Sequence, residues 1–456
     1  ASNGTFKFIG EAGSTETTHM EISAAGVVSI PSGSITLGSL DIGHGLGGNT
    51  ESTAIGKNAL DASLSGSIRN TAVGQDALGA LNHADADYNV AVGSYAGDAI
   101  TQGERNTAVG DHALSATATA DNNTAVGQSA LGSGVCASNN TAVGKHALTN
   151  CASDYNVAVG SNSGDAITSG VRNTAVGHNS LGATDDGHDN TAVGNSALAA
   201  NCGDNNVAVG KDALTVFTGS DATAVGNDAL KACTTGAENV AVGSAALGAV
   251  VDAHYNTAVG TSALAADCGS SNVAVGRLAL NVFTGDDATA IGTSAADAAT
   301  TAGNLTAVGR NAAGSVTDSD DHTAIGDNAL ASCTTGAQNT ALGSNAAFAL
   351  TGSSNVMLGM NSGYYATTTD DCVAIGRNAL LGASGNTTGN QNVAIGSYCL
   401  DAATSATENV AIGAYAGSAA TTASYSTFIG KNLSLIHISE PTRPERISYA
   451  GVCLKK

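Results

Sequence analysis

The chain has 456 residues, and its 38 Asp and Glu against 16 Lys and Arg give a formal net charge of -22. Such a surface would repel a phosphate backbone over most of its area, so we expect no nucleic-acid partner. No apolar run approaches the roughly twenty residues that span a bilayer, so we expect no membrane insertion. With no Trp and 59 Gly, the chain can fill only a thin core of small aliphatic side chains.

Residues 1–48 lack the repeat that dominates the rest of the chain. The stretches FKFIG, ISAAGVVSI and SITLGSL predict short β segments with turns between them. We interpret this region as an N-terminal β cap or attachment region, because an exposed first coil would template aggregation.

Residues 49–433 are built from one motif, seen in RNTAVGQDALGA at Arg69. The glycine of A-V-G occurs 23 times at a mean spacing of 17 residues, and Val or Ile precedes it in every copy except Leu342 and Leu358. A fixed period of this length predicts an all-β protein, a parallel β-solenoid of about 23 coils that stack with their neighbours.

The alternation of side chains along a strand predicts two different faces. It places the Thr/Val and Val/Ile positions on one face, which we expect to be the core, and Asn, Ala and Gly on the other. Because a solvent-facing position would vary over so many copies, the constant Ala predicts a face packed against another sheet or another chain. Members of this Ala face are Ala72, Ala91, Ala108, Ala125 and Ala142.

After the glycine come two variable residues and then Ala-Leu in most copies. The segment is too short for a stable helix, so we expect a tight turn, a second short strand that begins at Ala-Leu, and a return loop.

Asn occupies the fourth position before the glycine in 16 copies, which predicts a ladder of buried amides; the alternative is a turn residue. The expected ladder includes Asn70, Asn89, Asn106, Asn123, Asn140, Asn156, Asn173 and Asn190.

The chain has nine cysteines, and only Cys136 and Cys151 lie at similar loop positions on adjacent coils. The spacing of neighbouring strands suits the Cα separation of a disulfide, so this pair is the one predicted bond. Cys202, Cys233, Cys268 and Cys333 are two or more coils apart. They are buried small residues, free thiols or partners of another chain.

No residues form a convincing catalytic, cofactor or metal site, so we expect neither an enzyme nor a cofactor. VGQDAL resembles one hexapeptide of the acyltransferase β-helices, but those need three hexapeptides per coil. His112, His146 and His178 follow repeat glycines, but none sits beside a partnered carboxylate at a catalytic spacing, so we expect solvated loop histidines; a metal-binding ring of histidines about a threefold axis is the alternative. Asp185-Asp186, Asp286-Asp287 and Asp320-Asp321 could bind calcium weakly, but we expect solvated turns.

An ice-binding surface would need exposed Thr at two positions in each coil. Here the first position is Thr in 14 copies and Val in nine, and the second is Val or Ile, which we expect to point inward. The sequence therefore favours a structural role over ice binding.

Residues 434–456 match the repeat in no register and carry two of the three prolines. They resemble the translation of a sequencing adapter, so we expect a sequence artefact here, with a natural chain that continues past Leu433. A short C-terminal tail is the alternative.

The motif N-T/V-A-V/I-G-x-x-A/S resembles the head repeat of trimeric, YadA-like autotransporter adhesins and the N-T-A-V-G repeats of bacteriophage and marine viral tail fibres. The resemblance covers about residues 49–430. It implies a left-handed β-roll, a homotrimer with close packing at the Ala face, and a location outside the cell or on a virion. The expected function is a non-enzymatic fibre or adhesin that contacts a host receptor or glycan. The alternatives are a bacterial adhesin head and a single-chain solenoid with ice-binding or transferase activity.

Overall fold

A computed structural model describes residues 6–12, 15–22, 28–29, 35–37, 40–43, 51–62, 67–135, 137–383 and 387–433, with only the backbone described before residue 51. The chain divides into two compact units, Ala1–Ala208 and Val209–Lys456. Two predictions, the role of Cys136 and the nature of residues 434–456, fall outside the described residues.

The first unit begins with short antiparallel strands. β1 pairs with β2, β2 with β3, β4 with β5, and β5 with the first repeat strand, β6. The pairing of β5 with β6 covers an edge of the solenoid that would otherwise be open to another chain. These strands are β1 (Phe6–Ala12), β2 (Thr15–Ile22), β3 (Val28–Ser29), β4 (Ile35–Leu37) and β5 (Leu40–Gly43).

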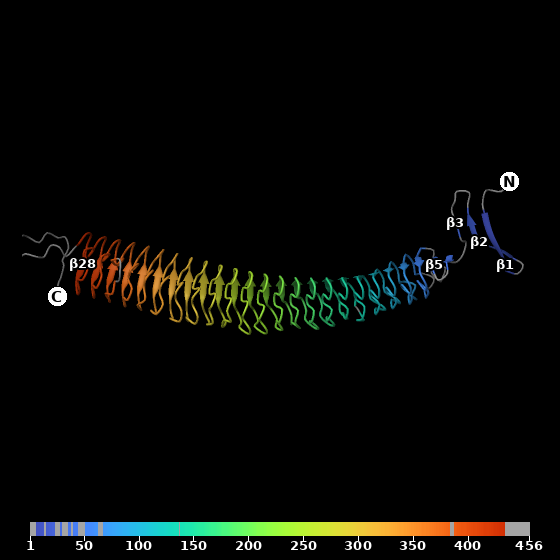
Figure 1. Ribbon diagram of the computed structural model, residues 1–456, viewed down its shortest axis with the longest axis horizontal. Coiled ribbons are helices and arrows are strands. Elements are labelled where there is room, and N and C mark those ends of the chain that lie inside the picture. The colour runs from blue at the N-terminus through green and yellow to red at the C-terminus, as the bar shows by residue number, and fades with distance from the viewer. Residues whose placement is uncertain are drawn as a thin grey trace, which may run out of the picture. The chain divides into compact units, whose positions relative to one another are not determined.

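The repeat forms a parallel β-solenoid, and each copy contributes one three-residue strand. Neighbouring strands pair in register, so that Thr124 lies beside Thr141 and Ala125 beside Ala142. Within each unit the strands lie side by side and point the same way (Figure 1). In the first unit they are β6 (Thr53–Ile55), β7 (Thr71–Val73), β8 (Val90–Val92), β9 (Thr107–Val109), β10 (Thr124–Val126), β11 (Thr141–Val143), β12 (Val157–Val159), β13 (Thr174–Val176) and β14 (Thr191–Val193).

The second unit repeats this arrangement, and the boundary between the units falls within β15 (Val207–Val209). Its strands are β16 (Thr223–Val225), β17 (Val240–Val242), β18 (Thr257–Val259), β19 (Val273–Val275), β20 (Thr289–Ile291), β21 (Thr306–Val308), β22 (Thr323–Ile325), β23 (Thr340–Leu342), β24 (Val356–Leu358), β25 (Val373–Ile375), β26 (Val393–Ile395), β27 (Val410–Ile412) and β28 (Thr427–Ile429).

The predicted second strand at Ala-Leu is wrong, because this segment is a series of turns. In the coil that follows β9, His112 and Leu114 both have left-handed backbone conformations, with φ of 53° and 53°, which no strand accommodates. Hydrogen bonds to the neighbouring coils stabilise them: His112 N donates to Ser94 O at 3.0 Å, and Leu114 N donates to Ala130 O at 2.9 Å. The leucine side chain is fully buried, which offsets the cost of this backbone conformation.

The structure also reverses the predicted orientation of the strands, because the Ala face is buried in the core and the Thr/Val and Val/Ile face points outward. Ala72, Ala91, Ala108, Ala125 and Ala142 are at most 1% exposed and lie inside the chain's own core. The Thr/Val and Val/Ile residues on either side of them are half-buried or exposed. The interior is thin and the leucines of the turns already fill it, so a methyl group suffices behind most strands. Met357 and Phe428 take the Ala position in two coils and are also fully buried, beside Gly363 and Gly417. The Ala face is therefore not a surface for another chain.

Candidate functional site

The outward side of the strands is the candidate functional site. Alternation continues beyond the three strand residues, so four positions of each coil face outward: the residue before the Asn position, the Thr/Val position, the Val/Ile position and the residue after the repeat glycine. We call these the leading column, the two central columns and the trailing column, and together they form the strand face. Between them, the Asn and Ala positions are buried.

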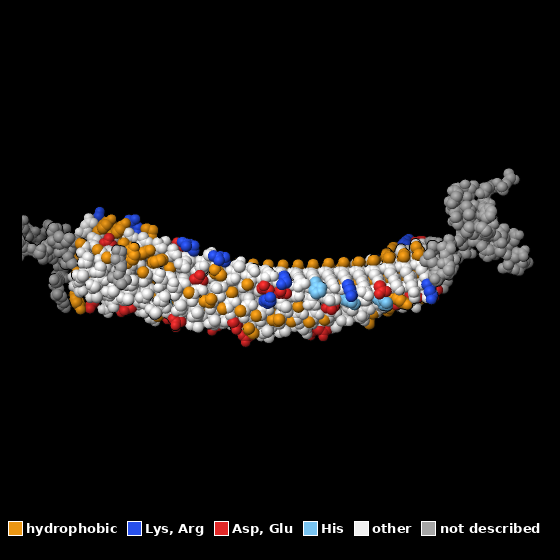
Figure 2. All heavy atoms as spheres, in the orientation of Figure 1, with side chains coloured by type: hydrophobic (Ala, Val, Ile, Leu, Met, Phe, Trp, Pro, Cys, Tyr) orange, Lys and Arg blue, Asp and Glu red, His pale blue; other side chains and the backbone are white. Residues whose placement is uncertain are grey.

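The central columns carry no charged residue in any of the 23 copies, although the chain has 54 charged side chains. Several of the apolar residues are well exposed, among them Val92 at 38%, Ile291 at 40% and Leu342 at 45%. Figure 2 shows hydrophobic side chains as a row along one border of the first unit, where the strands end in Figure 1. A solvated strand would be expected to vary among polar and charged residues, so this stripe is a candidate contact surface.

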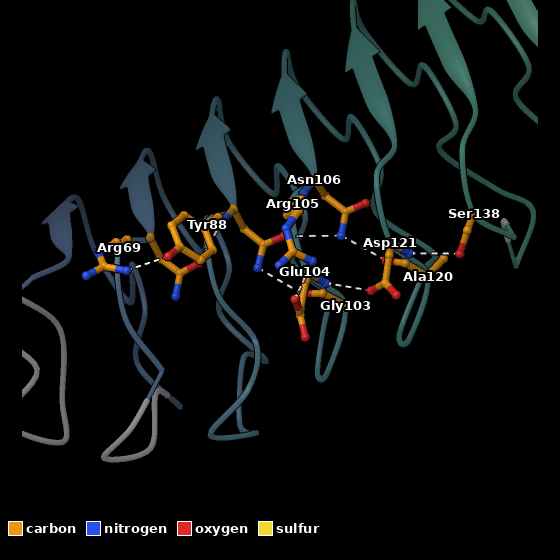
Figure 3. A network of polar contacts seen from close by, with 11 residues as sticks. Arg69, Tyr88, Gly103, Glu104, Arg105, Asn106, Ala120, Asp121 and Ser138 are labelled. Carbon is orange, nitrogen blue, oxygen red and sulfur yellow. Dashed lines mark hydrogen bonds and ion pairs between the residues drawn. The ribbon is translucent and has the colours of Figure 1, made fainter.

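The leading column of the first unit contains stacked basic and aromatic side chains (Figure 3). The guanidinium carbons of Arg69 and Arg105 lie 5.3 Å and 5.7 Å from the centroid of the Tyr88 ring. Arg69 also donates a hydrogen bond to the Tyr88 hydroxyl, and Arg105 forms an ion pair with Glu104 at 2.6 Å. The contacts of Arg69 and Arg105 with Tyr88 join successive coils along the edge of the strand face, whereas the ion pair lies within one coil.

The structure places the eight predicted ladder asparagines in the interior, each at most 1% exposed. Each Oδ1 accepts the backbone N–H at the next Asn position along the chain, at 2.8–3.0 Å. Seven of the eight also donate from Nδ2 to a loop carbonyl at 2.8–2.9 Å. The amide thus joins each strand to the next coil mainly through backbone groups.

Three other residue types take the place of Asn as acceptors in this ladder, and the first is Ser52, whose Oγ accepts from Asn70 N at 3.1 Å. His322 Nδ1 accepts from Asn339 N at 3.4 Å, and Cys372 Sγ accepts from Asn392 N at 3.4 Å. Burial lowers the pKa of His322, which keeps its ring neutral and able to accept. A buried acceptor is therefore the requirement at these coils, and a hydroxyl, an imidazole or a thiol meets it.

A second amide ladder escaped prediction. Asn311, Asn328, Asn345, Asn361 and Asn378 bond side chain to side chain over successive coils, with N···O distances from 2.9 to 3.4 Å. All five are the second residue after a repeat glycine and have positive φ, from 53° to 58°. Asn in the same position of five consecutive copies is a signal that the sequence does contain.

Seven cysteines lie in the described part of the chain, all buried and unbonded: Cys151, Cys202, Cys233, Cys268, Cys333, Cys372 and Cys399. Cys151 Sγ donates to Ser153 O at 3.3 Å, while Cys136 lies outside the described residues. The bond predicted between these two cysteines therefore stays a prediction. Burial raises the pKa of Cys268 to about 12 and those of Cys233, Cys333 and Cys399 to about 11.

We expect these seven thiols to be inert in the folded protein. The test is reaction with an aromatic disulfide reagent at about pH 8, using a Cys136→Ser/Cys453→Ser variant so that only the seven described thiols are counted. A thiolate is needed for attack, and both the raised pKa and the burial oppose it. We expect essentially none of the seven thiols to react in native buffer and all seven to react in denaturant. Fast reaction of the native protein would contradict the described burial.

The acidic pairs and histidines have structural partners. Asp320 Oδ1 accepts from Gly303 N at 2.7 Å, and Asp185 Oδ1 accepts from the Thr168 hydroxyl, so both join loops of adjacent coils. The His112 ring stacks on Tyr95 with centroids 4.9 Å apart. Among the described residues, no three His, Cys, Asp or Glu side chains are grouped to hold a metal ion, and no helix could span a membrane.

A comparison with models of known families, with curated proteins and with solved structures found no match.

Proposed function

We propose that this protein is a non-enzymatic structural fibre or adhesin of a virion or cell surface, whose chains associate side by side through the strand face. The observation that supports the proposal is the strand face itself: two outward columns without a charge in 23 copies of a chain whose net charge is -22. A partner that covers every coil must present apolar groups at the same spacing along its length. A second copy of this chain meets that requirement.

The resemblance to trimeric adhesin heads and viral tail fibres gives the number of copies as three. It also supports a receptor or glycan as the outer partner, contacted by the return loops. In this proposal the central columns replace the Ala face as the seam between chains, since the Ala residues are already buried within one chain. A bacterial adhesin head would share the same architecture.

The oligomeric state of the full chain tests the proposal. We expect light scattering to give three times the 44.2 kDa mass of one chain, with and without reductant. The substitutions Val242→Lys, Val259→Lys and Ile291→Lys together would place charges in the seam and should yield monomers, because a buried unpaired ammonium is strongly unfavourable.

The matched control combines Val216→Lys, Val251→Lys and Val282→Lys. These residues are 43%, 40% and 40% exposed, similar to the 37%, 36% and 40% of the seam residues, but they lie in the turns and loops. The control should keep the mass of the wild type. A monomeric wild-type chain, or equal dissociation by both sets of substitutions, would overturn the proposal.

Ice binding is the second candidate, because the Thr residues of 14 copies face outward and lie in register along the strands. The Val/Ile column beside them also faces outward, contrary to the prediction made from the sequence. If the wild-type chain is monomeric, thermal hysteresis that falls on Thr→Lys substitution in this column would favour this function.

A further inference from the structure

In the second unit, the two edges of the strand face carry opposite charges. Of the 13 leading positions that precede β16 to β28, six are acidic and none is basic. Of the 14 trailing positions from residue 211 onward, five are basic and one is acidic. The acidic leading residues are Asp221, Glu238, Asp287, Asp321, Asp371 and Glu408; the basic trailing residues are Lys211, Arg277, Arg310, Arg377 and Lys431.

Each of the five basic trailing residues lies in the same coil as an acidic leading residue or one coil away from it. Arg377 and Asp371 belong to the same coil, and Arg277 lies one coil from Asp287. Lys211 and Asp221, Arg310 and Asp321, and Lys431 and Glu408 are likewise one coil apart. Since neighbouring strands are separated by about 4.8 Å, long side chains can span one coil.

Most of these charges are available to a second chain. All eleven are exposed, and among the ten other than Asp221 the described part of the chain contains ion pairs only for Arg310, with Asp327 at 2.8 Å, and for Lys211, with Asp212 at 2.9 Å. Arg377 lies over the Tyr398 ring, 4.9 Å from its centroid, and keeps its charge available. Figure 2 shows Lys and Arg atoms beside hydrophobic side chains along this border of the second unit.

We propose that these charged edges make the chains assemble parallel and in register, with the acidic edge of one copy against the basic edge of the next. The inference rests on the proposed function, since it needs chains that associate through the strand face. When copies are related by rotation about an axis that runs beside the solenoids and parallel to them, the leading column of one meets the trailing column of its neighbour. When they pack face to face in opposite directions, like columns meet, and acidic residues repel acidic ones.

The test neutralises three of the six acidic leading residues in the full chain, with Asp287→Asn, Asp371→Asn and Glu408→Gln. These changes conserve shape at exposed positions with φ of 54–55°, so the coil should fold as before, which circular dichroism checks. In the parallel arrangement the variant loses attraction between neighbouring chains. We therefore expect the variant to be half-dissociated at about tenfold higher protein concentration than the wild type in low salt. About 0.5 M NaCl should remove this difference between the two proteins, because salt screens exposed charges. In an antiparallel arrangement repulsion is lost, so tighter assembly would overturn the proposal.

A charge exchange completes the test. Arg277→Glu, Arg377→Glu and Lys431→Glu alone should dissociate the assembly, and adding Asp287→Arg, Asp371→Arg and Glu408→Arg should restore it. Arg is tolerated at the leading position, because Arg69, Arg105 and Arg172 occupy it with φ of 56–60°. If the wild type associates but all charge variants behave like it, the edge inference is wrong and the proposed function stands. If the wild type is monomeric, the proposed function itself fails.

Discussion

Replacing one repeat glycine, Gly309→Ala, is expected to cost about 3 kcal/mol or more of folding free energy. Gly309 has φ of +136°, and a Cβ there would lie 2.4 Å from the carbonyl oxygen of Gly326 in the next coil. The strained backbone and the clash add together, because the obstructing atom belongs to a hydrogen-bonded strand end that has little room to move. The coils must separate locally, and the inter-strand hydrogen bonds next to the substitution weaken.

Gly430→Ala separates these two causes. Gly430 has the same φ of +136°, but no atom of the described residues lies within 4 Å of the position that its Cβ would occupy, so only the backbone strain applies. Urea unfolding gives the loss of stability, and hydrogen exchange locates it, since neighbouring coils should lose protection first in a solenoid. Equal losses in the two variants would show that the close approach of successive glycines contributes nothing.

The repeat length and the strand positions were predictable because a glycine that no other residue can replace marks every coil. A Cβ at Gly127 or at Gly309 would lie 2.4 Å from the carbonyl oxygen of the repeat glycine in the next coil. A steric requirement of this kind leaves one residue type at a fixed interval, and the period can be read without knowing the path of the chain.

The direction of the faces could not be read from hydrophobicity, because Val is more apolar than Ala and yet faces outward. The space inside the coil decides which face of the strand turns inward. Ala125 lies in a core that Leu131 already fills, and both residues are 0% exposed. The constancy of Asn offered the missing clue. Asn123 shares its face with Ala125, and a buried amide with a backbone partner is more constant than a solvated one.

The turn after the strand was unpredictable for a different reason. Leu131 has φ of 50°, a conformation that leucine rarely adopts alone, and only the next coil stabilises it, through the bond from Leu131 N to Ala147 O at 3.0 Å. The low intrinsic preference of leucine for a left-handed backbone conformation therefore predicts against this turn, which forms because the coils stack. The charged edges of the strand face were readable only after the outward positions were known.

Removing one ladder amide, Asn106→Ala, should destabilise the first unit by about 3 kcal/mol, because it leaves two buried backbone groups without partners. Asn106 Nδ2 donates to Ala120 O at 2.8 Å (Figure 3), and its Oδ1 accepts from Asn123 N at 3.0 Å. The alanine would also open a small cavity beside a side chain that is 1% exposed. Gln128→Ala, at an exposed trailing position, should change stability by less than about 0.5 kcal/mol.

Hydrogen exchange at Asn123 N distinguishes this ladder from a mere turn preference. If Asn106 only favoured a local backbone conformation, the loss would be confined to its own coil, and the amide of Asn123 would stay protected. If the amide joins the coils, Asn123 N should exchange much faster in the variant, while coils far along the first unit remain protected. Since each Asn accepts from the strand that follows it, the same substitution at Asn140 should expose Asn156 N in turn.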